Sequence, residues 1–186
     1  MHDLSGKRVA IVATDGYEQS ELEVPLARLA EAGAKVDVVS LKPGVIKGWH
    51  HGDWSRTVDV DKLVSEVSAH DYDAIVLPGG QINPDLLRAE HDVLKLVRDF
   101  WEQRKVVAAI CHAPWLLVEA GLVKGRNVTS YHSMKTDVIN AGGIWHDKDV
   151  VTDQGLITSR KPSDLEAFCQ KIAEEIAEGR HQHRAA

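Results

Sequence analysis

The feature of this sequence that most constrains its fold is the alternation of short apolar runs with longer segments of helical periodicity. The runs at 8–14, 35–41, 74–77 and 106–110 have the length of buried strands. The segments between them place apolar residues at helical spacing, most clearly at 91–104. This order is typical of α/β proteins, so we predict a mostly parallel central sheet with helices on both faces.

The second half of the chain repeats this pattern in shorter pieces. The elements predicted there are strands at 127–130, 150–152 and 156–159, a helix at 135–141 and a final helix from about Pro162. A chain of 186 residues, 44% of them hydrophobic, has the size and the core material of one domain. We therefore predict a single domain over 1–186, with a polar tail at 179–186 that frays.

Charge and composition exclude several classes of function. The formal net charge of −6 lacks the basic field that attracts nucleic acid, and no apolar run approaches the ~20 residues of a membrane-spanning helix. The N-terminal residues have no apolar signal core, and the two cysteines, Cys111 and Cys169, form no disulfide framework. We expect a protein that stays in the reducing cytoplasm and binds neither nucleic acid nor a membrane.

The segment 45–59 interrupts the alternation. It is rich in Gly, His and Trp, and it predicts an excursion from the sheet in the form of a hairpin. Adjacent residues of an extended segment point to opposite faces, so we assign His50 and His51 to the surface or to a subunit contact rather than to a metal site. No phosphate-binding loop or Cys-x-x-Cys pair occurs, and we expect neither a metal nor a cofactor.

Chemistry is concentrated where the run 106–110 ends. Cys111 follows this strand directly, and His112, small residues and an apolar helical stretch come next. This is the layout of a nucleophile elbow, which raises a side chain above the carboxyl end of the sheet, where ligands of open α/β sheets bind. The start of the next helix favours a thiolate, so we expect a lowered pKa for Cys111. A lone cysteine that ends a core strand is, however, more commonly a small buried hydrophobe.

Two other strand ends face the same crevice. Glu18 and Glu21 fall in the first turn of the helix that follows the first strand, on one side of it. A carboxylate there also complements the helix dipole, and this role explains Glu18 equally well. Gly79 and Gly80 end the strand at 74–77, where they either direct backbone N–H groups at a developing oxyanion or form a simple turn.

Taken together, these residues resemble the PfpI (intracellular protease I) family, within the superfamily that includes the Parkinson-linked protein deglycase and the class I glutamine amidotransferase domains. The resemblance runs in family order through nearly the whole chain. It is carried by the segments GYEQSELEVP (16–25), DAIVLPGG (73–80), AAICHAPWLL (108–117), GRNVTSYHSMKTDVINAGG (125–143) and ITSRKPSDL (157–165). Departures from the family pattern at Ala113 and Trp115 concern the pocket shape and the substrate more than the nucleophile.

The resemblance implies a flavodoxin-like three-layer sandwich that assembles as a homodimer or homohexamer. By motif position it makes Cys111 the nucleophile and Glu21 the acid that hydrogen-bonds the sulfur, with Glu18 as a companion carboxylate. It makes His112 the catalytic histidine. It gives Asp85, on a loop after the third strand, the place of an acid that a neighbouring subunit supplies to that histidine. The active site would then lie near a subunit interface.

The resemblance also completes the predicted pocket. Gly79, Gly80 and the backbone of His112 resemble the oxyanion-hole elements of the family. Tyr131 falls where the family has a tyrosine at the edge of its pocket. None of these residues implies a metal.

The predicted contact between Glu21 and Cys111 constrains the protonation of both groups. An ionised carboxylate beside a thiolate is repulsive, so Glu21 should be protonated and donate a hydrogen bond to the sulfur. The two groups should titrate as a pair. A partly exposed thiolate is also the form most prone to oxidation.

Three classes of function remain open. In the first, Cys111 adds to a reactive carbonyl such as methylglyoxal or its early protein adduct, as in a glyoxalase or deglycase, and His112 or Glu21 moves the proton. In the second, a cysteine peptidase, Cys111 attacks a peptide carbonyl with His112 as base and Asp85 as its orienting acid. In the third, the chain is a non-enzymatic stress protein that senses oxidation or acts as a chaperone. We favour the first, because an acid beside the sulfur helps to hold a thiolate but does little for an amide leaving group.

Overall fold

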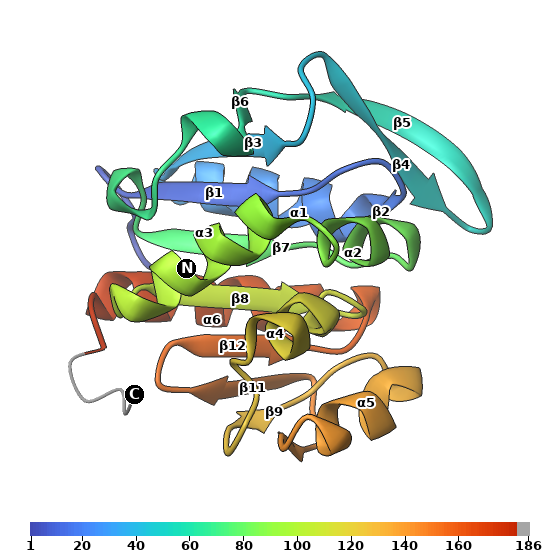
Figure 1. Cartoon of the computed structure of the whole chain (residues 1–186). Coiled ribbons are helices and arrows are strands. Elements are labelled where there is room, and N and C mark those ends of the chain that lie inside the picture. The colour runs from blue at the N-terminus through green and yellow to red at the C-terminus, as the bar shows by residue number, and fades with distance from the viewer. Residues whose placement is uncertain (182–186) are drawn as a thin grey trace.

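The computed structural model describes residues 1–181, which form a central seven-stranded sheet between two layers of helices (Figure 1). The strand order is β11-β12-β8-β7-β1-β3-β6, and neighbouring strands are parallel except for β11, which is antiparallel to β12. The strands are β1 Arg8–Val12, β3 Lys35–Ser40, β6 Lys62–Leu63, β7 Ala74–Leu77, β8 Val106–Ile110, β11 Val150–Asp153 and β12 Leu156–Ser159. The predicted α/β class with a mostly parallel, flavodoxin-like sheet is confirmed.

The helices within residues 1–181 lie on both faces of this sheet. They are α1 Gln19–Glu31, α2 Ile82–Leu87, α3 His91–Glu102, α4 Pro114–Ala120, α5 Lys135–Asn140 and α6 Leu165–Glu178. Helices α3 and α4 cover one face, and α1 and α6 cover the other (Figure 1). Over the same residues, none of the helices is both long and apolar enough to cross a membrane. The tail is predicted to fray over 179–186, but the His181 N–H donates to Arg104 O at 3.1 Å, and residues 182–186 lie outside the described residues.

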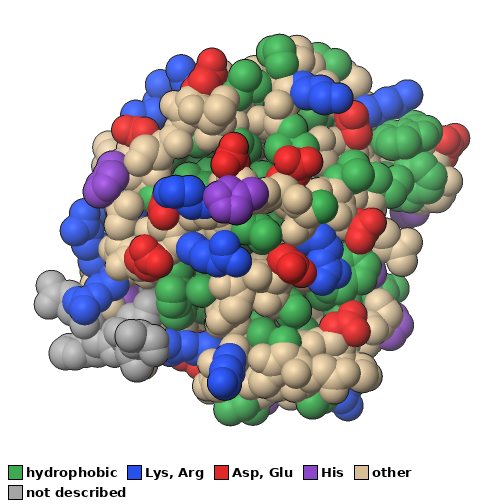
Figure 2. Space-filling view, in the orientation of Figure 1, with side chains coloured by type: hydrophobic (Ala, Val, Ile, Leu, Met, Phe, Trp, Pro, Cys, Tyr) green, Lys and Arg blue, Asp and Glu red, His purple; other side chains and the backbone are tan. Residues whose placement is uncertain are grey.

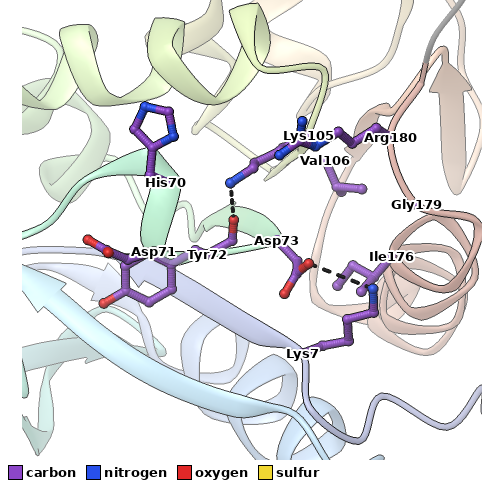
Figure 3. Close-up of a pocket in the computed structure, with 10 residues that line it drawn as sticks. All are labelled: Lys7, His70, Asp71, Tyr72, Asp73, Lys105, Val106, Ile176, Gly179 and Arg180. Carbon is purple, nitrogen blue, oxygen red and sulfur yellow. Dashed lines mark hydrogen bonds and ion pairs between the residues drawn. The ribbon is translucent and has the colours of Figure 1, made fainter.

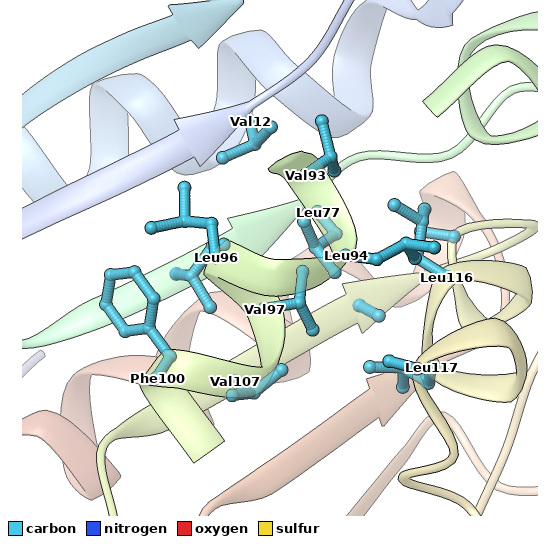
Figure 4. Packing of buried hydrophobic residues seen from close by; sticks show 14 of the residues in the cluster. Val12, Leu77, Val93, Leu94, Leu96, Val97, Phe100, Val107, Leu116 and Leu117 are labelled. Carbon is cyan, nitrogen blue, oxygen red and sulfur yellow. The ribbon is translucent and has the colours of Figure 1, made fainter. Parts of the chain in front are cut away.

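The strands read as continuous apolar runs because successive side chains enter two different cores. In β1, Ala10 and Val12 face the core under α3 and α4, whereas Val9 and Ile11 face the core under α1 and α6. Figure 4 shows the first of these cores, in which Phe100 of α3 packs over the strand side chains. Burial on both faces fixes the strands rigidly, so the residues at their carboxyl ends have defined positions.

The hairpin predicted at 45–59 is confirmed. It comprises β4 (Val45–His50) and β5 (Asp53–Asp59), and β2 (Tyr17–Glu18) pairs in parallel with β4 to make a second, three-stranded sheet. The hairpin projects from one side of the molecule (Figure 1). Hydrophobic side chains gather on the surface there (Figure 2), where Trp54 is 45% exposed.

The least regular part of the fold lies beside β11. The strand predicted at 127–130 is shorter, since only β9 (Asn127–Val128) pairs with β10 (Ile144–Trp145). The backbone N–H of Thr129 donates to the Thr158 hydroxyl at 2.8 Å, so it does not continue the ladder.

The strand order creates a crevice at the carboxyl edge of the sheet. From β1 the chain turns to β3 on one side, while β7 and β8 lie on the other. The connections after β1 and β7 therefore leave in opposite directions, which is the topology that opens a binding site in α/β proteins.

Candidate active site

Cys111 occupies a sharp turn between β8 and α4. Its φ of 64° lies in the left-handed region, which costs a residue with a Cβ about 1–2 kcal/mol. The turn is held from both sides, because the Cys111 N–H donates to Ser159 O at 3.1 Å and the Cys111 carbonyl accepts from Tyr131 N at 2.8 Å. Helix α4 then begins at Pro114, whose missing N–H is no loss in a first turn. The sulfur is thereby presented at the carboxyl edge of the sheet.

A cavity of about 400 Å³ lies over this turn. The predicted site residues that line it are Glu18, Glu21, Gly80, Cys111, His112 and Tyr131. The other lining residues, which are not among the predicted site residues, are Trp49, Gln81, Ile82 and Pro162. Segments far apart in the chain thus form one pocket around the Cys111 thiol.

The Glu21 side chain is fully buried beside the thiol. Its Oε2 accepts the Gly79 N–H at 2.9 Å, and its Oε1 has no nitrogen or oxygen partner among the described residues. Burial, and then the charge of Glu18, raise the pKa of Glu21 to about 8, against the opposing effect of hydrogen bonds from Cys111, Gly79 and Gly80. Glu21 is therefore mostly protonated at neutral pH, and its carboxyl group interacts with the Cys111 thiol.

The predicted lowering of the Cys111 pKa is wrong for this environment. Burial raises the pKa of the thiol, and a charged Glu21 raises it further, while the backbone N–H groups of Gly80 and His112 lower it. The thiol is only 6% exposed, so burial outweighs these donors. When Glu21 is protonated, its negative charge no longer contributes to the raised pKa of the Cys111 thiol.

His112 is placed to take the proton of the thiol. Its Nδ1 lies 3.2 Å from Cys111 Sγ, and burial, with a smaller effect of His132, lowers its pKa. The ring is stacked on Tyr131 with centroids 4.8 Å apart, and the Ser133 hydroxyl lies 3.4 Å from Nε2. A neutral imidazole fixed in this way can accept a proton at Nδ1 while Nε2 carries its own.

Gly79 is needed for close packing rather than for an oxyanion. A Cβ at this position would lie 2.5 Å from Glu21 Oε2 and 2.7 Å from Cys111 Cβ. The Gly79 N–H is already used by Glu21, so of the three predicted backbone donors those of Gly80 and His112 are the ones that reach the sulfur. Gly80 has a φ of 80°, which suits glycine.

Glu18 caps helix α1 and also lines the cavity. Its Oε2 accepts the Glu21 N–H at 2.9 Å, and its Oε1 lies 3.3 Å from His50 Nδ1. The assignment of His50 to the surface is therefore incomplete, because the pairing of β2 with β4 brings this residue and Trp49 to the site. His50 and His51 also do not point apart, since His51 turns with a φ of 49° and the ring centroids are 4.0 Å apart.

Asp85 is the predicted site residue that the structure places elsewhere. It lies in the first turn of α2, not on a loop, and it does not line the cavity. Its side chain is exposed and makes no hydrogen bond or ion pair with residues 1–181. Within one chain, Asp85 therefore does not orient His112.

Fold and site together define an α/β protein with a buried cysteine site at the carboxyl edge of its sheet. The chain belongs to the DJ-1/PfpI family, whose model matches residues 7–175. A deglycase of Pyrococcus abyssi (strain GE5 / Orsay) is 41% identical over 165 residues, which cover 89% of this chain and 96% of the relative. General stress protein 18 of Bacillus subtilis (strain 168) is 39% identical over 165 residues, which cover 88% of this chain and 94% of the relative.

A solved structure agrees with the sequence relatives. The crystal structure of Drosophila melanogaster DJ-1beta superposes with a TM-score of 0.83 at 34% sequence identity, over 92% of this chain and 90% of that one. The predicted resemblance to the PfpI family is thus confirmed.

Proposed function

We propose that this chain is a stress-protection cysteine enzyme that converts small reactive carbonyls, free or as early protein adducts, through Cys111. The observation that carries the proposal is the buried pair of Cys111 and protonated Glu21 in a cavity of about 400 Å³. The relatives that are named a deglycase and a general stress protein support it. Cys111 and Cys169 are both free thiols, which supports the reducing cytoplasm as its compartment.

The first step in this proposal is addition of the thiol to an aldehyde such as methylglyoxal. A bond forms between Sγ of Cys111 and the aldehyde carbon, and the thiol proton passes to His112 Nδ1, 3.2 Å away. The carbonyl oxygen takes the proton of Glu21, which gives a hemithioacetal. A protonated carboxyl suits this task because it holds an acidic proton at neutral pH.

The second step oxidises the former aldehyde carbon and reduces the neighbouring carbonyl carbon of the same substrate, so no external oxidant is needed. The Glu21 carboxylate removes the proton from the former aldehyde carbon, and His112 protonates the neighbouring carbonyl oxygen to give an enediol. Return of a proton to the second carbon and loss of the hydroxyl proton yield a thioester of lactate on Cys111. Water hydrolyses this thioester, which releases lactate and restores the thiol.

The shape of the site favours this chemistry over the two alternatives. A peptidase must seat an extended chain across its nucleophile, but Cys111 is 6% exposed inside a cavity. A chaperone needs neither the carboxyl nor the histidine at the thiol, and a redox sensor needs an accessible thiolate, which the burial of Cys111 disfavours. The contact between Cys111 and His112 alone is compatible with a peptidase, so the test must include peptides.

The deciding experiment supplies methylglyoxal, glyoxal and a panel of fluorogenic peptides to the purified protein and to its Cys111→Ser variant. We expect turnover of the carbonyls, and a loss of about 10³-fold or more in the variant because the nucleophile is removed. Cys169→Ser is the matched control, since this second thiol is buried in the core under α6 and should leave turnover unchanged. Robust peptide cleavage that depends on Cys111, without carbonyl turnover, would replace the proposal by a peptidase.

In the proposed assembly, a homodimer or homohexamer, Asp85 of the partner subunit approaches His112. Two observations support an acid supplied to His112 by another subunit. The Asp85 side chain is exposed, and the contact of His112 Nε2 with the Ser133 hydroxyl is long, at 3.4 Å. Asp85→Ala and His112→Ala should each be nearly inactive as homo-oligomers. In a dimer that exchanges subunits at random, mixing the two should restore about a quarter of wild-type activity per site. Confirmed exchange without recovery would remove Asp85 from the site.

A further inference from the structure

We infer that the Glu18 carboxylate makes this cavity selective for uncharged carbonyls, such as 2-oxoaldehydes, against carbonyls that carry a carboxylate. The inference rests on the proposed function for the identity of the substrate. It concerns which molecules reach the Cys111 thiol, so it is measurable without turnover.

The charge balance of the cavity wall carries the inference. Among the lining residues, which all lie in the described part of the chain, the ionisable side chains are Glu18, Glu21, Cys111, His112 and Tyr131, and there is no lysine or arginine. Burial leaves Glu21 protonated and His112 uncharged at neutral pH. Glu18 therefore supplies the negative charge of this wall, and the same charge raises the pKa of Glu21.

The Glu18 side chain is fixed where an entering molecule would meet it. Its Oε2 accepts hydrogen bonds from Glu21 N at 2.9 Å and from the Ser20 hydroxyl at 2.5 Å. The side chain is 18% exposed, so the carboxylate is neither free to swing into solvent nor removed from the cavity. His50, 3.3 Å from Oε1, is the basic side chain in contact with it.

The size of the effect follows from Coulomb's law. Two like charges about 7 Å apart in a partly solvated cavity disfavour occupancy by roughly tenfold. A neutral 2-oxoaldehyde is not affected, whereas an α-keto acid or an aldehyde acid is repelled. The carboxylate product of the proposed reaction is repelled as well, so Glu18 also promotes product release.

The test compares two alkylating agents of nearly equal size, iodoacetamide and iodoacetate, which differ in one negative charge. The rate of modification at Cys111 is followed by peptide mass mapping, and each rate is divided by the rate of the same reagent with a small free thiol. We expect the amide to be favoured roughly tenfold beyond the free-thiol ratio. Glu18→Gln keeps an oxygen acceptor for the Glu21 N–H and should bring the ratio close to that of the free thiol.

Two controls separate the cavity charge from other causes. Glu23→Gln removes the same charge from helix α1 at a residue that pairs with Arg56 outside the cavity, and it should leave the ratio unchanged. The Glu18→Gln change is repeated in a Glu21→Gln background, where ionisation of residue 21 contributes nothing. A ratio that stays at the free-thiol value in the wild type, or that Glu18→Gln does not alter in either background, would overturn the inference.

The outcome is independent of the carbonyl assay. Charge discrimination by Glu18 together with absent methylglyoxal turnover would leave the selectivity standing and reject the proposed function. Methylglyoxal turnover without charge discrimination would support the proposed function and reject the selectivity by Glu18.

Discussion

The two ends of the central sheet each contain a cavity next to a buried titratable side chain. At the carboxyl end this group is Glu21; at the amino end it is Lys105, beside a cavity of about 330 Å³ that is also lined by Lys7, Asp73 and Arg180 (Figure 3). Burial shifts both groups toward their neutral forms, since it raises the pKa of Glu21 and lowers that of Lys105.

The two groups differ in what their polar atoms contact. Lys105 Nζ donates to Ala69 O at 2.5 Å and to Tyr72 O at 2.6 Å, and these bonds tie the segment before β7 to the start of β8. Glu21 uses Oε2 for the Gly79 N–H, its Oε1 has no hydrogen-bond partner among the described residues, and its carboxyl group interacts with the Cys111 thiol. A buried charge-bearing group therefore does not by itself mark a site; a buried group with an uncommitted atom beside a nucleophile does.

The strongest test of this comparison is the pH dependence of stability in Glu21→Gln. The folded-state pKa of Glu21 is raised from 4.5 to about 8, so the folded protein retains a proton that the unfolded chain releases. The wild type should therefore lose about 4 kcal/mol of unfolding free energy, relative to the variant, as pH rises between these values. Urea denaturation of both proteins at a series of pH values measures this difference. Parallel curves would show that Glu21 is ionised in the fold.

The next effect concerns Lys105→Met. The methionine fills similar volume but leaves two carbonyls without their donor, so we expect a loss of about 3 kcal/mol in unfolding free energy. The alkylation rate of Cys111 in the folded protein should stay within about twofold of wild type, because the two cavities lie at opposite ends of rigid strands. Lys95→Met removes an exposed lysine whose ion partner is Asp99, and it should cost less than about 1 kcal/mol. A large fall in Cys111 reactivity would contradict the assignment of Lys105 to structure.

The smallest effect compares a glycine from each end. Gly79→Ala forces a Cβ against Glu21 and Cys111 and should cost about 2 kcal/mol, with a loss of thiol reactivity. Gly179 lines the Lys105 cavity, and no atom of the described residues lies within 4 Å of its would-be Cβ. Gly179→Ala should therefore cost only the strain of its φ of 91° and ψ of −145°, about 1–3 kcal/mol. Differential scanning calorimetry and iodoacetamide labelling report both quantities. Equal reactivity in the two variants would remove the special role of packing at Gly79.

Local sequence was sufficient to predict the longer strands of the central sheet (β1, β3, β7, β8, β11 and β12) and the Cys111 turn. An uninterrupted apolar run such as Val106–Ile110 is buried on both faces, and the residue directly after it must emerge at the edge of the sheet. Sequence was insufficient for the wall formed by Trp49, because this wall depends on pairing of β2 with β4, which are almost thirty residues apart along the chain. No periodicity within either segment encodes that contact.

Two errors have different physical origins. The helix dipole after Cys111 is a local property and predicts a lowered pKa, but the segments that bury the sulfur come from elsewhere in the chain and dominate. The expected loop at Asp85 agrees with the proline that precedes it, yet proline is tolerated in a first turn, so α2 begins at Ile82 and includes both residues.

The left-handed backbone at Cys111 also sets opposing evolutionary pressures on this codon. Glycine at position 111 would relieve the strain of the Cβ, with a net gain of up to about 1 kcal/mol in stability. A laboratory population screened only for heat tolerance should therefore accumulate glycine here and lose the thiol, whereas a screen for survival of carbonyl stress should retain cysteine.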